Sequence, residues 1–169
     1  VYGPYGGAGA FSAYNPTTGS YAHGSAVYGS GGATANADWY NARTGVTGST
    51  NQNSNAYGRW GSSTLSGPNQ TVHTQSQSDA RGSAGSFTST SGAEGAGVRG
   101  AGGNSAGAVK TSSGNVYAGA DGNVYKKTDS GGWEQSNGSG GWSQVDGAQA
   151  RDRAATSGAT GQLERDSSA

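Results

Sequence analysis

Two glycine-rich stretches match motifs that carry chemistry in enzymes. Gly103-Asn104-Ser105-Ala106-Gly107 fits the G-x-S-x-G pattern, which in α/β-hydrolases places a nucleophilic serine on a sharp turn between a strand and a helix. Residues 95–100, GAGVRG, fit the G-x-G-x-x-G pattern of dinucleotide-binding loops. In a chain with 34 Gly among 169 residues, about one match to each pattern is expected by chance, and neither match has an apolar strand before it and a helix after it. We therefore expect no catalytic residue and no enzymatic activity.

The residues that bind metals or move protons are few and scattered. His23 and His73 lie far apart in polar segments, without a carboxylate placed nearby in the sequence. The ten acidic residues form neither an EF-hand loop nor a calcium-binding nonapeptide, and there is no Cys to supply a thiolate. The ten basic residues balance the acidic ones, so the chain has no electrostatic footprint for nucleic acid. We expect no metal, no cofactor and no nucleic-acid partner.

The aromatic side chains are the one remaining group with binding chemistry. The chain has only two Leu, two Phe, nine Val and no Ile, so its rings must form a core or a contact between subunits, since each ring can bury roughly 150–250 Å². The alternative is that exposed rings stack on sugars. The residues predicted to serve in packing or assembly are Tyr14, Tyr28, Trp39, Tyr40, Tyr57, Trp60, Tyr117, Tyr125, Trp133 and Trp142.

The composition is too poor in large aliphatic residues for an ordinary globular core. Ordering a residue costs on the order of 1–2 kcal/mol of backbone entropy, and Gly loses the most. Disordered chains, however, usually carry a high net charge, whereas this chain has a net charge of zero and 12% charged residues. Backbone hydrogen bonding in repetitive sheets, stacked rings or assembly with further copies must then supply the order.

The first 91 residues contain a repeat of 26 residues. Val1-Tyr2-Gly3 returns as Val27-Tyr28-Gly29, and the segment YNPTTG at 14–19 returns as YNARTG at 40–45. Asn-Pro-x-x-Gly is typical of tight turns, and the Ser, Thr, Ala, Val and aromatic residues between the turns favour strands. Each repeat is therefore predicted to form two strands. The residues expected to set the turns are Asn15, Pro16, Gly19, Asn41 and Gly45.

Beyond residue 91 the pattern changes three times. Residues 92–112 are mostly Gly and Ala, and residues 113–146 carry aromatic residues at intervals of eight or nine. Asp121-Gly122 between two Val-Tyr pairs is a strong signal for a hairpin, so we expect four strands of four or five residues whose rings lie on neighbouring strands. Residues 147–169 lack aromatic residues and are interpreted as a polar tail.

The YNPxTG-type repeats, the segments STNQN and GRWGSST, and the closing GNVYAGADGNVYK and GGW elements carry a resemblance to a known group of proteins. Over nearly all of residues 1–146 the chain resembles the Gly- and Tyr-rich repeat regions at the C-terminus of large secreted or cell-surface bacterial proteins. The resemblance implies an exported protein at the bacterial surface. Ala42 stands where the first repeat has Pro16, which is expected to weaken the second turn.

These observations predict an all-β fold, a repetitive antiparallel meander or a β-solenoid-like sheet of short strands. No apolar run is long enough to span a membrane. The first residue is not Met, so we expect the chain to belong to a longer or processed product. The expected function is that of an extracellular structural protein that assembles with copies of itself through strand pairing. The alternative is a cell-surface module that binds polysaccharide through exposed Tyr and Trp.

Overall fold

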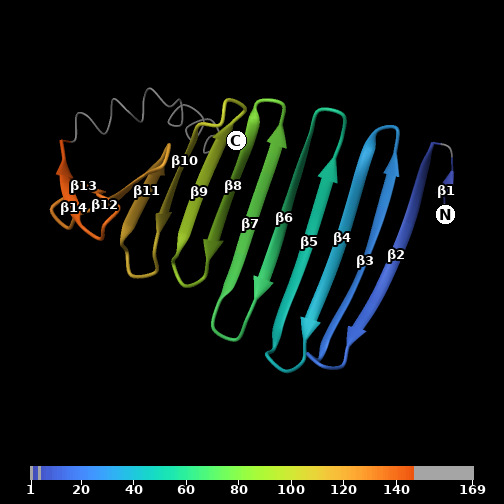
Figure 1. Cartoon of the computed structure of the whole chain (residues 1–169). Helices are drawn as coiled ribbons and strands as arrows, with labels where there is room; N and C mark the ends of the chain where they lie inside the picture. Colours follow the sequence, from blue (N-terminus) through green and yellow to red (C-terminus); the bar gives the residue numbers. More distant parts are fainter. Residues whose placement is uncertain (1, 4, 147–169) are drawn as a thin grey trace. The chain divides into compact units, whose positions relative to one another are not determined.

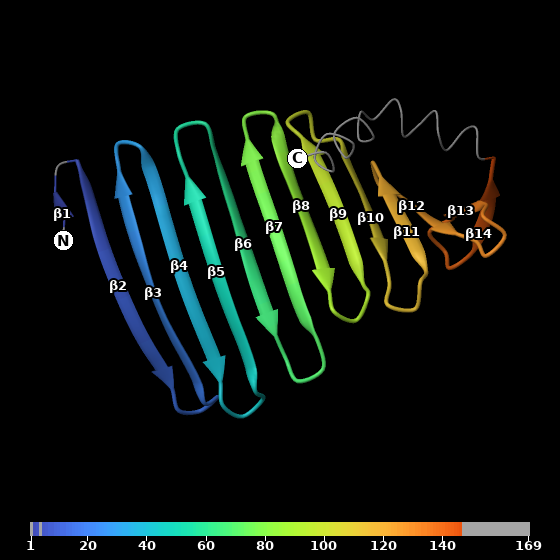
Figure 2. The same ribbon diagram turned by 180° about the vertical axis from the view of Figure 1, so that it is seen from behind.

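The computed structural model describes residues 2–3 and 5–146, which form only strands, turns and bends. Every strand pair with a defined register is antiparallel and joins strands that follow one another in the sequence, as Figures 1 and 2 show. The prediction of an all-β, repetitive antiparallel meander is confirmed. The part of the chain described here contains no helix, and so none that is long and apolar enough to cross a membrane.

The chain divides into two compact units between Ser91 and Gly92. The first unit contains β1 (Tyr2–Gly3), β2 (Gly6–Asn15), β3 (Ser20–Gly29), β4 (Gly32–Asn41), β5 (Val46–Ser54), β6 (Gly58–Ser66), β7 (Thr71–Asp79) and β8 (Gly82–Ser89). The second contains β9 (Glu94–Gly100), β10 (Ser105–Lys110), β11 (Val116–Ala120), β12 (Asn123–Lys127), β13 (Trp133–Ser136) and β14 (Trp142–Val145). The polar tail predicted for residues 147–169 lies outside the described residues.

The 26-residue repeat corresponds to two strands and two turns. β2 and β3 have ten residues each, and they are separated by a four-residue turn at 16–19 and followed by a two-residue turn at 30–31. The cycle then begins again at Gly32 with β4, which also has ten residues. The prediction of two strands per repeat is therefore confirmed.

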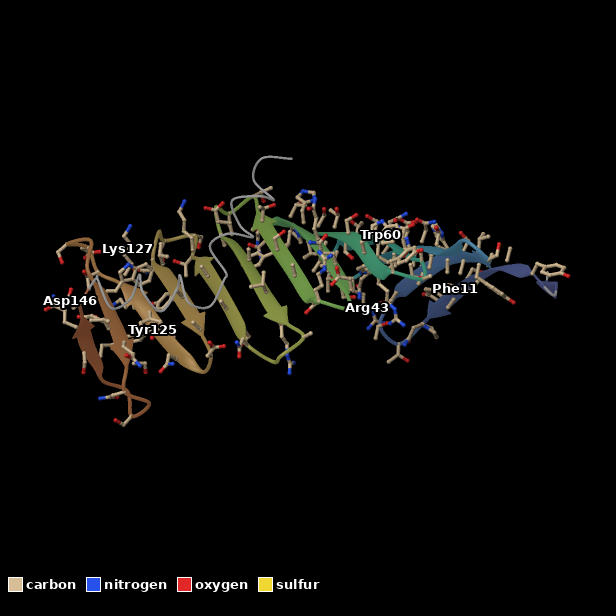
Figure 3. All side chains as sticks on the ribbon, turned by 90° about the horizontal axis from the view of Figure 1, so that it is seen from above. Phe11, Arg43, Trp60, Tyr125, Lys127 and Asp146 are labelled. Atoms are coloured by element: carbon tan, nitrogen blue, oxygen red, sulfur yellow. The ribbon has the colours of Figure 1, made fainter. Side chains whose placement is uncertain are left out.

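The sheet of each unit is a single layer without a hydrophobic core. None of the described hydrophobic side chains is buried, and the side chains stand on both sides of the strands in Figure 3. Burial in a second layer therefore contributes little to the order of this fold, which depends on the continuous backbone ladders and on contacts between side chains of neighbouring strands.

The Asp-Gly pair forms the tight hairpin that its sequence predicts. Asp121 and Gly122 have φ angles of 47° and 86°, the positive values that a two-residue type I′ turn requires at both central positions. Glycine adopts this conformation without steric cost, and Asp is among the few other residues that tolerate it. The turn joins β11 to β12, which pair from Ala120↔Asn123 to Tyr117↔Lys126.

Candidate functional site

Neither enzyme-like motif lies in the context that its chemistry requires. Ser105 is the first residue of β10, and its backbone N–H donates a hydrogen bond to Asp121 Oδ1 at 2.8 Å. Residues 95–100 belong to β9 and form a strand rather than a loop. A nucleophile elbow and a phosphate-binding loop are each followed by a helix. In the part of the chain that the structure describes, both motifs are instead followed by further strands.

Successive residues of a strand point to opposite sides of the sheet, so the first unit has two faces. The two faces carry different side chains. We call them the Trp39 face and the Tyr40 face, after two consecutive residues of β4. The register places on the Trp39 face the residues Gly7, Phe11, Ala13, Ala22, Gly24, Ala26, Tyr28, Ala33, Ala35, Ala37, Gly48, Leu65, Val72 and Phe87. It places on the Tyr40 face the residues Ser12, Tyr14, Tyr21, His23, Thr34, Asn36, Asp38, Asn51, Asn53, Trp60, His73 and Gln75.

On the Trp39 face, three aromatic rings each lie over a glycine directly opposite on the next strand. The pairs are Tyr28 with Gly7, Phe11 with Gly24, and Trp39 with Gly48. A Cβ added to these glycines would lie 2.7 Å from Tyr28 Cε1, 2.6 Å from Phe11 Cε1 and 2.0 Å from Trp39 Cζ2. Each ring thus covers backbone that lacks a side chain of its own, a pairing that stabilises glycine-containing strands.

Side-chain hydrogen bonds connect β4 and β5 on the Tyr40 face. Thr34 Oγ1 donates to Asn53 Oδ1 at 2.9 Å, Asn53 Nδ2 donates to Asn51 Oδ1, and Asn51 Nδ2 donates to Asn36 Oδ1. The four residues form one network that links the two strands across their ladder. The difference between the two faces could not be predicted from the sequence, because small polar residues are found throughout the strands. The strand register is needed to assign each residue to a face.

His23 lies between Ser12 on β2 and Asp38 on β4, each directly opposite it across a ladder. These are the residue types of a serine-hydrolase triad, and neither the sequence spacing nor any motif indicated that they meet. Within the described residues, however, no hydrogen bond or ion pair joins the three side chains, and all three are exposed. Ser12, His23 and Asp38 therefore lack the hydrogen-bonded, water-excluding arrangement that nucleophilic catalysis requires.

The second histidine has a polar contact on the neighbouring strand: His73 Nδ1 lies 3.0 Å from Thr64 Oγ1. Among the described residues, no three His, Asp or Glu side chains gather into a group that could hold a metal ion. The arrangement of titratable residues thus offers no metal centre within that part of the chain.

The two turns of the repeat are built in the same way. Asn15 Oδ1 accepts hydrogen bonds from the N–H groups of Thr17 at 3.0 Å and Thr18 at 3.3 Å, and Asn41 Oδ1 accepts them from Arg43 and Thr44 at 3.0 and 3.1 Å. In each turn a glycine, Gly19 or Gly45, has a φ of 69° or 68° and donates its N–H to the backbone oxygen of the asparagine at 2.9 Å. Asn55 and Asp79 accept hydrogen bonds from the following turns in the same manner.

The second turn is also hydrogen-bonded to the first. Ala42 N–H donates to Gly19 O at 3.0 Å, and Arg43 Nη2 donates to Pro16 O at 3.3 Å. Asn41 Nδ2 donates to Ser20 Oγ at 3.0 Å. Proline at position 42 would lack the N–H that reaches Gly19, so the departure from the repeat at Ala42 provides a hydrogen bond between neighbouring turns.

In the second unit the four predicted rings lie one on each of β11–β14, but they are divided between the two faces. Tyr117 and Trp142 share one face, and their ring centroids lie 6.4 Å apart at an interplanar angle of 53°. Tyr125 and Trp133 share the other face as diagonal neighbours on β12 and β13. Two strands, β12 and β13, lie between Tyr117 on β11 and Trp142 on β14, and adjacent strands lie roughly 4.8 Å apart, so the contact requires β11–β14 to curve toward the Tyr117 side.

The remaining predicted ring residues lie at exposed positions of the first unit. Tyr57 belongs to the turn between β5 and β6 and is 86% exposed. Trp60 lies on β6, directly opposite Asn53 and Gln77, and is 46% exposed.

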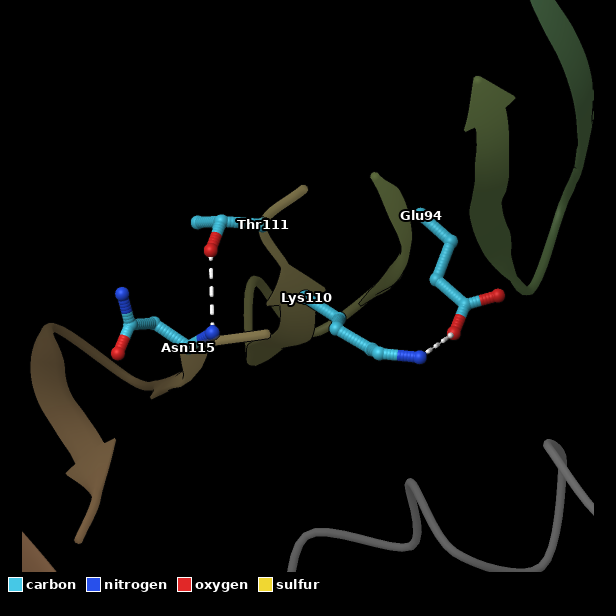
Figure 4. A network of polar contacts seen from close by, with 4 residues as sticks. All are labelled: Glu94, Lys110, Thr111 and Asn115. Carbon is cyan, nitrogen blue, oxygen red and sulfur yellow. Dashed lines mark hydrogen bonds and ion pairs between the residues drawn. The ribbon is translucent and has the colours of Figure 1, made fainter. Parts of the chain in front are cut away.

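Polar contacts of the second unit lie at its surface and do not form a site. Lys110 Nζ and Glu94 Oε1 form an exposed ion pair at 3.3 Å between β10 and β9 (Figure 4). Thr111 Oγ1 accepts a hydrogen bond from the backbone N–H of Asn115 at 3.1 Å in the turn that leads to β11, which the same figure shows. Exposed pairs of this kind contribute about 0–1 kcal/mol to stability.

The chain was compared with protein-family models, with curated proteins and with solved structures, and none of them matches it. The two faces and the strand edges are therefore the features of the molecule that bear on its function.

Proposed function

We propose that this chain is a structural repeat protein, exported to the bacterial cell surface or the extracellular space, that assembles with copies of itself into a fibre, matrix or surface layer. The observation that carries this proposal is the absence of any buried hydrophobic side chain among the described residues. A single layer of strands leaves both faces and its edges available for contact with other copies.

Strand β2 offers an edge for such contacts. It pairs with β3 along its whole length, from Gly6↔Gly29 to Asn15↔Ser20, but with β1 only at Gly6 and Gly7. From Gly9 to Asn15, β2 has no second strand partner among the described residues. Edges of this kind accept further strands by backbone hydrogen bonding, which is a general route to polymerisation.

The Trp39 face offers a surface for packing against another layer. Along β2–β4 this face carries mostly Ala, Gly and aromatic residues, and along β5–β8 it carries mostly Ser, Thr and Gly. The only charged residue on this face of strands β2–β8 is Arg59. Faces with small side chains can approach each other closely and exclude water, as they do between stacked sheets. Strand pairing at the edge and packing through this face would together extend an assembly in two directions.

A second candidate function is supported by the row of exposed tyrosines on the Tyr40 face. Tyr14, Tyr21 and Tyr40 are 67%, 43% and 46% exposed and lie directly opposite one another on three consecutive strands. Flat rings on an open surface can stack on the sugar rings of a polysaccharide, so a carbohydrate-binding surface module remains the alternative.

Negative-stain electron microscopy of the purified full chain, together with a pull-down on insoluble polysaccharides such as cellulose and chitin, distinguishes the two functions. We expect regular fibres or sheets and no retention on the polysaccharides. Monomers that are retained on a polysaccharide would contradict assembly and support the carbohydrate-binding module.

A further inference from the structure

The three tyrosines of the Tyr40 face form one row across the strands. Tyr14 on β2 is the direct partner of Tyr21 on β3, and Tyr21 is the direct partner of Tyr40 on β4. Residues directly opposite in an antiparallel ladder have Cβ atoms about 4.5–5.5 Å apart and lie on the same face. The phenol ring of Tyr21 can therefore reach that of Tyr14 or that of Tyr40 by rotation of the side chains alone.

The phenol rings of this row have one ring contact among the described residues: the ring centroids of Tyr21 and His23, two residues apart on β3, lie 5.7 Å from each other. In residues 2–3 and 5–146, no hydrogen bond engages the hydroxyl of Tyr14, Tyr21 or Tyr40, and each side chain is more than two-fifths exposed. The three rings are thus both accessible to an oxidant and held close together by a backbone ladder. Such pre-positioning makes a reaction between two groups of one chain much faster than the same reaction between separate molecules.

We propose that this row is a site of oxidative tyrosine cross-linking, in which Tyr21 couples to Tyr14 or to Tyr40. A peroxidase using hydrogen peroxide removes one electron and one proton from each of two phenols, which gives two phenoxyl radicals. The radicals form a carbon–carbon bond between two Cε ring carbons, each ortho to the carbon that bears the oxygen, and the two hydrogens at that bond move to the oxygens and restore both phenols. The net loss of two electrons and two protons reduces one hydrogen peroxide to two waters.

The three tyrosines of the row are favoured over other exposed tyrosines by their positions opposite one another, not by greater accessibility. Tyr5 and Tyr57 are each 86% exposed, more than any tyrosine of the row, but they lie in different turns that are separated by strands β2–β5. Exposure alone would make Tyr5 and Tyr57 the most reactive residues, whereas strand register favours Tyr14, Tyr21 and Tyr40. Both coupling partners belong to one chain, so the inference goes beyond the proposed self-assembly and does not depend on it.

The test is oxidation of the dilute full chain with a peroxidase and hydrogen peroxide, followed by dityrosine fluorescence and tandem mass spectrometry. Proteolytic cleavage before Asp38 separates Tyr40 from the other two tyrosines, so a Tyr21–Tyr40 link joins two peptides and a Tyr14–Tyr21 link lowers the mass of one peptide by two hydrogens. We expect most links at these two pairs, in a yield that does not change on dilution. Links that map mainly to Tyr5 or Tyr57, or that vanish on dilution, would overturn the proposal.

Two matched variants complete the test. Tyr21→Phe keeps the central ring but removes the hydroxyl from which a phenoxyl radical forms, and it should lower the dityrosine yield several-fold. Tyr57→Phe makes the same change at a more exposed ring outside the row and should leave the yield unchanged. Should Tyr21→Phe alter the circular dichroism spectrum, oxidation of the wild-type chain in denaturing urea takes its place: loss of the native register should then lower the yield of the Tyr21–Tyr40 link. An equal yield in urea would show that register has no part in the coupling.

Discussion

The indole of Trp39 lies directly over Gly48, its partner across the β4–β5 ladder, so closely that a Cβ at position 48 would lie 2.0 Å from Trp39 Cζ2. The ring occupies the space that a side chain at position 48 would fill. In a sheet without a second layer, such a contact within one face replaces part of the burial that a core would otherwise provide.

Gly48→Ala should therefore destabilise the first unit. The new methyl group collides with the indole and must displace it, which costs about 1–3 kcal/mol. The measurement is the free energy of unfolding in urea. Gly9→Ala is the matched control, because Gly9 lies on the same face of β2 and a Cβ there has no neighbour within 4 Å. This control should be neutral or stabilising by up to about 1 kcal/mol, and equal losses in both variants would contradict the role of the ring.

Ala42→Pro restores the residue of the first repeat, yet it should lower stability. Proline removes the N–H that Ala42 donates to Gly19 O, and the loss of one such hydrogen bond costs about 0.5–1.5 kcal/mol. Thermal unfolding followed by circular dichroism measures the change. Ala42→Ser keeps the N–H and should stay within about 0.5 kcal/mol of the wild type. A more stable proline variant would show that preorganisation of the turn outweighs the contact between turns.

The ring pair of the second unit can be tested by a double-mutant cycle. Tyr117→Ala and Trp142→Ala should show a coupling free energy of about 0.5–1.5 kcal/mol, because their rings contact each other. Tyr117→Ala combined with Trp133→Ala provides the comparison, since these rings lie on opposite faces and their effects should add within about 0.5 kcal/mol. The coupling is read from unfolding free energies, and equal coupling in the two cycles would contradict the division of the rings between faces.

A charge on the edge strand should weaken assembly if β2 accepts further strands. Ser12→Lys places an ammonium group on β2, and lysine on edge strands opposes pairing between sheets. Ser62→Lys introduces the same charge on the same face of β6, which is paired on both sides by β5 and β7. Light scattering should show slower or weaker assembly for Ser12→Lys alone, and identical behaviour of the two variants would exclude the β2 edge as the growing surface.

The sequence predicted those parts of the fold that depend on neighbouring residues. Asn15 and Gly19 lie four residues apart and form their turn within a short segment, and the same local chemistry at Asn41 and Gly45 repeats it 26 residues later. The alternation of strands and turns in the first unit could be predicted for this reason. The small polar residues between the turns carried no comparable signal for which side chains share a face.

The division of the rings between the two faces depends on the length of each turn. Tyr117 and Tyr125 are eight residues apart, an even number, whereas a two-residue turn at Asp121-Gly122 pairs residues that differ by an odd number, such as Tyr117 and Lys126. The two tyrosines therefore point to opposite faces. The pairs of rings with glycines and the alignment of Ser12, His23 and Asp38 likewise depend on a register that becomes known only once the strands are paired.

Within the residues that the structure describes, each strand of the first unit pairs with strands that directly precede or follow it in the sequence. A segment of 26 residues is therefore a module of two strands and two turns, here called a cassette. Inserting or deleting one cassette adds or removes two strands with their own turns and leaves every other ladder intact, so evolution or an experimenter can change the number of strands without redesigning the remainder. The cooperativity of unfolding should then decrease with distance along the sheet. Local unfolding of one hairpin need not unfold strands that lie several positions away.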